Sequence, residues 1–153
     1  MGVEIERKFL VKSDQWRNLA QGELYRQGYI PTLESTVRIR VIRDRGFLTI
    51  KGKTQGISRA EFEYEIPVED ATQMLDQLCK PPLIEKYRHK IELNGLVWEV
   101  DEFLGANRGL TIAEVELKSA DQAIELPEWI GEDVSHDPCY YNSNLAQHPY
   151  TTW

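Results

Sequence analysis

The stretch Glu4-Ile5-Glu6-Arg7-Lys8 sets a pattern that the rest of the chain repeats. In an extended strand, residues of one parity leave the same face, so Glu4, Glu6 and Lys8 stand in a row. Glu4 and Glu6 then lie about 7 Å apart. At that separation two carboxylates repel by about 2.4 kcal/mol at an effective dielectric constant near 20. Such a pair is left in water or holds a cation, and a divalent metal ion is the natural choice.

Charged and apolar residues alternate in most of the other extended segments as well. The period of two predicts strands with one apolar face and one charged face. Eight strands are expected, at residues 3–11, 24–30, 36–43, 47–53, 60–67, 84–93, 96–103 and 110–117. Helices are expected at residues 14–20, 68–80, 120–126 and 140–146, the last capped by Asp137 or Asn142. Eight strands joined largely by short turns are typical of an antiparallel sheet, and such a sheet can close into a barrel.

Composition excludes several classes of protein. The 153 residues predict a single domain over 1–153, long enough to bury about two-thirds of the unfolded surface. A net charge of −7 argues against a nucleic-acid partner, which favours a basic domain. The N-terminus has no apolar leader and the chain has no long apolar run, so we expect neither secretion nor a membrane partner. Cys79 and Cys139 lack metal-site spacing and are expected to be ordinary thiols in the reducing cytoplasm.

Composition does not decide which strand face lies inside. A charged strand face is usually solvated, and a small lipocalin-like barrel with an apolar interior would look the same. Two details favour a charged interior. The charged faces consist almost entirely of Arg, Lys, Glu and Asp, and their signs are sorted by segment. A basic wall facing an acidic wall suits a metal-bound polyanion, because cations hold phosphate oxygens while carboxylates hold the bridging metal.

With these segments in hand, the chain resembles the CYTH superfamily, also called triphosphate tunnel metalloenzymes. The hallmark Glu-x-Glu-x-Lys is present as Glu4, Glu6 and Lys8. It is followed in family order by TVRIR at 36–40, LTIKGK at 48–53, RAEFEYE at 59–65, EKYR at 85–88 and AEVEL at 113–117. The match runs over residues 3–117, and residues 142–146 resemble the short C-terminus of small bacterial members.

The resemblance implies an all-β-dominated fold: an eight-stranded antiparallel closed barrel, or tunnel, with a charged interior and a few peripheral helices. It also implies two Mg²⁺ or Mn²⁺ ions. The residues carried over as metal ligands are Glu4, Glu6, Glu61, Glu63, Glu114 and Glu116, with Asp101 as a weaker member. Those carried over as phosphate-binding are Lys8, Arg38, Arg40, Lys51, Lys53, Lys86 and Arg88, with Arg59 as a weaker member. Lys8 and Lys86 are also expected to take part in catalysis.

The expected reaction is metal-dependent hydrolysis of inorganic tripolyphosphate, a small-molecule triphosphate, to pyrophosphate and phosphate. The alternatives are hydrolysis of thiamine or nucleoside triphosphate, cyclisation of ATP by an adenylate cyclase, and a non-catalytic module that binds polyphosphate or nucleotides. Tyr29, on the same strand parity as Tyr25 and Gln27, is a candidate general base if nearby cations lower its pKa. The outward apolar strand faces make a homodimer plausible.

Overall fold

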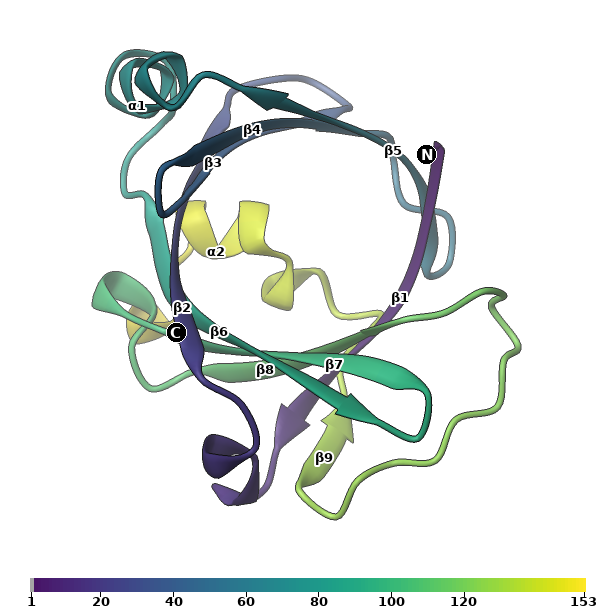
Figure 1. Cartoon of the computed structure of the whole chain (residues 1–153). Helices are drawn as coiled ribbons and strands as arrows, with labels where there is room; N and C mark the ends of the chain where they lie inside the picture. The colour runs from purple at the N-terminus through teal and green to yellow at the C-terminus, as the bar shows by residue number, and fades with distance from the viewer. Residues whose placement is uncertain (1) are drawn as a thin grey trace.

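The computed structural model describes residues 2–153, and its main feature is one antiparallel sheet closed into a barrel (Figure 1). The strands run in the order β5-β4-β3-β2-β6-β7-β8-β1, and pairing of β1 with β5 closes the ring. Their bounds are β1 Gly2–Val11, β2 Gly22–Ile30, β3 Thr36–Ile42, β4 Arg45–Lys51, β5 Ser58–Ile66, β6 Ile84–Leu93, β7 Leu96–Phe103 and β8 Thr111–Glu116. The predicted eight-stranded antiparallel barrel is therefore confirmed, with strand bounds that differ by at most two residues.

Local turn chemistry explains some of these boundaries. Asn94 and Gly95 both adopt positive φ angles, 52° and 77°, which the tight hairpin between β6 and β7 requires and which Asn and Gly tolerate best. Pro67 directly precedes helix α1, Val68–Gln77, and Glu69 and Asp70 place negative charge in its first turn. Helix α1 packs outside the barrel against β3 and β4 (Figure 1).

The helix predicted at 68–80 is present but ends at Gln77, and the other three predicted helices differ more. Residues 14–20 contain only a 3-10 helix, Gln15–Asn18. Residues 120–126 are not helical, because the Ser119 hydroxyl bonds Asp121 and the Gln122 side chain accepts from the backbone of Lys118. Such local bonds compete with helix formation. The segment 140–146 divides into a 3-10 helix, Pro138–Tyr140, and helix α2, Asn142–Gln147.

The segment after residue 126 is more structured than its polar sequence indicates. A ninth strand, β9 Ile130–Asp133, pairs with β1 outside the ring and was not predicted. Seen down the barrel, α2 lies within the outline of the ring (Figure 1). Leu145 and Ala146 of α2 are buried against Ile84, Phe103 and Ile112 of the barrel. The C-terminal segment therefore closes one end of the barrel with apolar side chains. None of the helices in residues 2–153 has the length and apolar character to cross a membrane.

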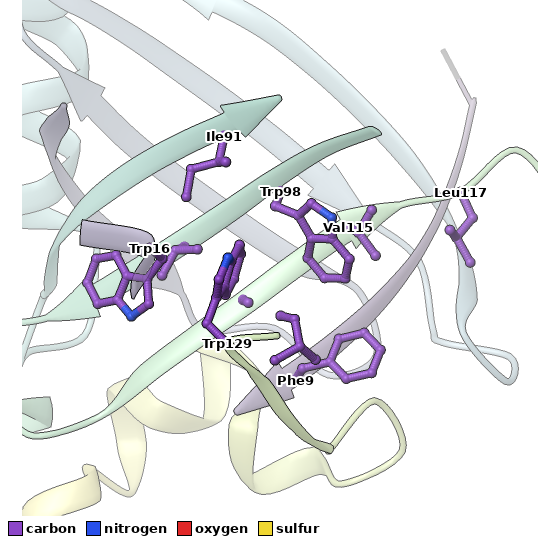
Figure 2. Packing of buried hydrophobic residues seen from close by; sticks show 10 residues of the cluster. Phe9, Trp16, Ile91, Trp98, Val115, Leu117 and Trp129 are labelled. Carbon is purple, nitrogen blue, oxygen red and sulfur yellow. The ribbon is translucent and has the colours of Figure 1, made fainter. Parts of the chain in front are cut away.

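The main cores lie outside the ring, on the apolar strand faces. One contains Phe9, Trp98 and Val115 on the strands, covered by Trp16 and Trp129 from the connecting segments (Figure 2). A second lies under α1, where Ala71 and Leu75 pack on Ile39. Because the apolar faces are covered from outside, the opposite, charged faces point into the barrel. The expectation of a charged interior is confirmed, and the alternative with an apolar interior is wrong.

Candidate active site

The charged strand faces enclose a cavity of about 220 Å³ inside the barrel. It holds equal numbers of acidic and basic side chains, seven of each. The acidic ones are Glu4, Glu6, Glu61, Glu63, Glu99, Glu114 and Glu116. The basic ones are Lys8, Arg38, Arg40, Lys51, Arg59, Lys86 and Arg88. The remaining lining residues are Tyr29, Thr36, Asn142 and Ser143.

The strand order separates these charges into two arcs. The basic arc comprises Lys51, Arg38, Arg40, Lys86 and Arg88, on the contiguous run β4-β3-β2-β6. The acidic arc comprises the seven glutamates, on the contiguous run β7-β8-β1-β5. Lys8 and Arg59 are the two cations of the lining that lie on strands of the acidic arc. Ring closure therefore turns sign sorting along the sequence into two facing walls.

Some carboxylates are fully compensated by cations. Glu114 Oε2 lies 2.8 Å from Lys8 Nζ, and its Oε1 lies 3.2 Å from Arg88 Nη2. Burial opposes ionisation of Glu114, but these cations hold its pKa well below the usual range. Glu4 lies 3.1 Å from Lys51 Nζ and 3.4 Å from Arg59 Nε. Its pKa is likewise lowered, because Lys51 and Arg59 outweigh the effect of burial.

In three other carboxylates, Glu61 among them although Lys51 Nζ lies 3.3 Å from it, the nearby cations do not outweigh burial and like charge. Burial, together with the neighbouring Glu114 and Glu4, raises the pKa of Glu6 to about 8 although Lys8 lies 3.5 Å away. Burial and the charge of Glu4 also raise the pKa of Glu61 and of Glu116. Register places Glu6 directly opposite Glu116 on the paired strands β1 and β8. In this part of the acidic arc the protein's own cations do not outweigh the cost of ionising the carboxyl groups, so Glu6 keeps its proton at neutral pH.

The basic arc carries the opposite surplus. Burial and the neighbouring Arg38 and Arg88 lower the pKa of Arg40 to about 10. Burial lowers the pKa of Lys86 to about 7, although Asp101 favours its charged form. Within residues 2–153, the buried Nε atoms of Arg38 and Arg40 have no hydrogen-bond partner. Buried, unpaired donors and crowded cations are features of a site that binds an anion.

The donor set of the acidic arc fits a hard divalent cation. Carboxylate oxygens are the ligands that Mg²⁺ and Mn²⁺ prefer. A cation beside Glu6, Glu61 and Glu116 would offset the repulsion that raises their pKa values. Within residues 2–153, no three carboxylate, His or Cys side chains are already arranged so that they could hold a metal ion together. Glu4, Glu63 and Glu114 instead face lysines and arginines.

Tyr29 lines the cavity, as a role in the reaction requires. Its hydroxyl accepts a hydrogen bond from Gln27 Nε2 at 2.9 Å. The predicted lowering of its pKa is wrong in direction. Burial raises the pKa of the phenol, and the nearby Arg38, Lys8 and Arg40 do not overcome it. Tyr29 is therefore poorly suited to act as a general base.

Two other predicted residues lie elsewhere than expected. Lys53 is exposed in the loop after β4, which ends at Lys51, and it is not part of the cavity lining. Asp101 is completely buried, and Arg88 binds both its oxygens, at 2.7 and 2.8 Å. Asp101 therefore holds Arg88 of the basic arc in place. Because both its oxygens accept hydrogen bonds from Arg88, Asp101 is not available as a metal ligand. Glu99 of β7 also lines the cavity.

Asn142 and Ser143 line the cavity although the sequence analysis assigned them no part in the site. Both come from α2, and the strand periodicity that identified the other lining residues does not reach that segment. Asn142 was considered only as a helix cap, and its side chain does not cap α2. Asn142 and Ser143 are recognised as lining residues only from the position of α2 against the barrel.

A closed antiparallel barrel with facing basic and acidic walls defines a class of proteins that enclose a polyanion in a tunnel. The sequence profile of the CYTH domain matches residues 2–149, and the chain belongs to this family.

Relatives cover nearly the whole chain. An inorganic triphosphatase of Acetivibrio thermocellus is 54% identical over 151 residues, covering 98% of this chain and 97% of the relative. An inorganic triphosphatase of Nitrosomonas europaea is 38% identical over 154 residues, covering 94% of this chain and 97% of the relative. A crystal structure of an inorganic triphosphatase superposes with a TM-score of 0.67 at 35% identity, covering 93% of this chain and 96% of that one. A Pyrococcus horikoshii protein, with a TM-score of 0.60 at 19% identity over 77% and 80% of the two chains, shares the fold.

Proposed function

We propose that this protein hydrolyses inorganic tripolyphosphate to pyrophosphate and phosphate inside the barrel. The observation that carries the proposal is the pair of facing arcs, in each of which burial and crowding with like charge oppose ionisation of a side chain. Relatives at 54% and 38% identity, both inorganic triphosphatases, support the same reaction.

The basic arc binds the substrate in this proposal. Arg38, Arg40, Lys51, Lys86 and Arg88 provide N–H donors along one wall of the cavity. Phosphoryl transfer depends mainly on positioning and on stabilising the charge that develops on the phosphoryl and leaving groups. Prearranged cations in a partly buried cavity supply both. Lys8, held between Glu6 and Glu114, is a further cation from the acidic arc.

Charge balance supports a requirement for divalent metal. When all of them are ionised, the seven carboxylates and seven cations of the cavity offset one another. A bound triphosphate adds several negative charges, so additional cations are needed. We assign two Mg²⁺ or Mn²⁺ ions to Glu4, Glu6, Glu61, Glu63, Glu114 and Glu116. A bound cation would favour the ionised form most at Glu6, Glu61 and Glu116, whose pKa values are raised. A bound ion would polarise phosphate oxygens and lower the pKa of a coordinated water.

The size and lining of the cavity favour an inorganic substrate over an organic triphosphate. Its volume of about 220 Å³ is smaller than the roughly 300–1,000 Å³ of pockets for drug-sized ligands. Among the described residues that line it, Tyr29 is the one aromatic side chain. Recognition of a nucleobase or a thiamine ring generally uses a larger, more apolar surface.

The test is phosphate release from tripolyphosphate, ATP and thiamine triphosphate, each with Mg²⁺, with Mn²⁺ and with a chelator. We expect the largest kcat/KM for tripolyphosphate and loss of turnover in the chelator. Faster cleavage of an organic triphosphate would replace the proposed substrate. Turnover that persists in the chelator would overturn the role of the metal. Tight tripolyphosphate binding without turnover would indicate a binding module.

Location and assembly remain predictions. A cytoplasmic location is supported by the free thiols of Cys79 and Cys139. A homodimer is supported by apolar side chains left uncovered on the outer face, among them Phe62 and Tyr64, which are 44% and 58% exposed. Fractionation of cells and light scattering of the purified protein test these two predictions.

A further inference from the structure

The ammonium of Lys86 is held from two sides. Its Nζ lies 2.8 Å from Asp101 Oδ2 on β7 and donates to Asn142 Oδ1 on α2 at 3.0 Å. The Lys86 side chain is 1% exposed, yet Lys86 is part of the cavity lining. An ammonium has three N–H donors. When Lys86 is protonated, as the adjacent Asp101 favours, two are occupied by these oxygens, which leaves the third for the cavity.

Both anchors are themselves fixed. Arg88 binds Asp101 through two hydrogen bonds. Asn142 begins α2, which is seated in the barrel end by the buried Leu145. The fully buried Gln27 places its Nε2 between Asn142 Oδ1, at 3.5 Å, and the Tyr29 hydroxyl, at 2.9 Å. A donor group held by prearranged neighbours in this way keeps its direction when substrate binds.

Helix formation does not account for the Asn142 side chain. The N-cap of α2 is Tyr141, so Asn142 lies one residue past the position from which a side chain caps the first turn. In α2 no side chain caps the first turn, and the Asn142 carboxamide oxygen faces Lys86 and Gln27 instead. The Asn142 side chain is thus directed towards the basic arc.

We propose that Asn142 is a positioning residue that aims Lys86 at the triphosphate. With Asp101 it fixes the ammonium so that the remaining N–H meets a phosphate oxygen in the reacting geometry. The proposal rests on the proposed function. The role of α2 then extends beyond closing the barrel end, because it adds one polar contact to the catalytic wall.

The main experiment compares Asn142→Ala, Asn142→Asp and Asn144→Ala with the wild type in tripolyphosphate hydrolysis. Asn142→Ala is expected to lower kcat by about 10- to 100-fold, the scale for a misplaced group, with a much smaller change in KM. Asn142→Asp keeps an oxygen for Lys86, so most of kcat should return, while its added negative charge raises KM. Asn144→Ala makes the same substitution in the same helix, where the amide bonds Pro138 O, and should keep kcat.

A second measurement tests whether Asn142 acts through Lys86. In a Lys86→Ala background, adding Asn142→Ala should cause little further loss, because the group it positions is absent. A full additional loss in that background overturns the proposal. So does an unchanged kcat in Asn142→Ala, or an equal loss in Asn142→Ala and Asn144→Ala. Absence of wild-type turnover is a different result, because it removes the proposed function itself.

Discussion

The two ends of the barrel interior are built from the same strands yet have opposite character. On β1, Leu10 follows Lys8 at the next inward position, and on β8 Ile112 precedes Glu114 in the same way. On β6, Ile84 precedes Lys86. These apolar residues pack against Leu145 of α2, whereas the charged residues two positions away line the cavity. One interior therefore divides into an apolar end that is filled by α2 and a charged part that is left open.

The difference shows how a barrel can carry a costly polar interior. Buried charges of one sign destabilise a fold unless they are paired. The apolar end and the outer cores supply the burial that stabilises the ring, and the charged part contains carboxyl groups, such as Glu6, whose ionisation the surrounding protein disfavours. Substitutions in the two parts should consequently have opposite effects on stability and activity.

Glu6→Gln should produce the largest change, in the charged part. Removing a carboxylate from the proposed metal site should lower kcat/KM for tripolyphosphate by about 100-fold or more, since a metal ion contributes several kcal/mol to such reactions. The measurement is steady-state phosphate release in Mg²⁺ and in Mn²⁺. Glu65→Gln is the matched control, because Glu65 shares the inward parity but pairs with Arg45 outside the cavity. Equal losses in both variants would contradict the assignment.

Leu145→Ala tests the apolar end. Leu145 is fully buried, so its truncation should lower the free energy of unfolding by about 2–5 kcal/mol. Urea denaturation monitored by tryptophan fluorescence measures the change. Leu78→Ala, at a residue 52% exposed after α1, should cost less than about 0.5 kcal/mol. If Leu145→Ala is as mild as Leu78→Ala, α2 does not hold the barrel end.

Lys51→Ala and Lys53→Ala sharpen the boundary of the charged part. Both lysines belong to one sequence motif, but only Lys51 lines the cavity. Loss of a charged hydrogen bond to phosphate should raise KM for tripolyphosphate about 10-fold in Lys51→Ala. Lys53→Ala should leave KM unchanged. A comparable rise in Lys53→Ala would mean that the loop after β4 reaches the substrate.

Glu6→Gln should also stabilise the metal-free protein at pH 8. The pKa of Glu6 is raised in the folded state from 4.5 to about 8. Between these values the folded chain retains a proton that the unfolded chain has released, so this group makes stability fall as pH rises. Glutamine cannot ionise and avoids that loss.

Thermal melts in chelator at pH 5 and pH 8 measure this effect. The variant should exceed the wild type by a few degrees at pH 8 and by much less at pH 5. A difference that does not grow with pH would show that Glu6 is not a source of strain in the metal-free site. The same variant would then combine lost activity with unaltered stability.

Much of the site follows from strand periodicity, with clear limits. The six glutamates that the family resemblance assigned as metal ligands lie on the charged strand faces, and all six line one cavity. Lys53 was predicted to bind phosphate but lies outside the cavity. The strand β4 ends at Lys51, and alternation of side chains between two faces holds only within a strand. Asp101 has the correct parity, but Arg88 and Lys86 occupy its oxygens, which depends on packing between β6 and β7. The pKa of Tyr29 followed burial, which a motif does not report.

The sequence by itself determined the strands, their charged faces and the sorting of sign along the chain, because a period of two fixes which side chains share a face. Only the tertiary structure decided that the charged faces point inward, that the basic and acidic strands form facing arcs, and that Asn142 reaches Lys86. These features depend on ring closure between β1 and β5 and on α2 packing into the barrel end. Both bring together residues far apart in the chain, and local patterns carry no information about such contacts.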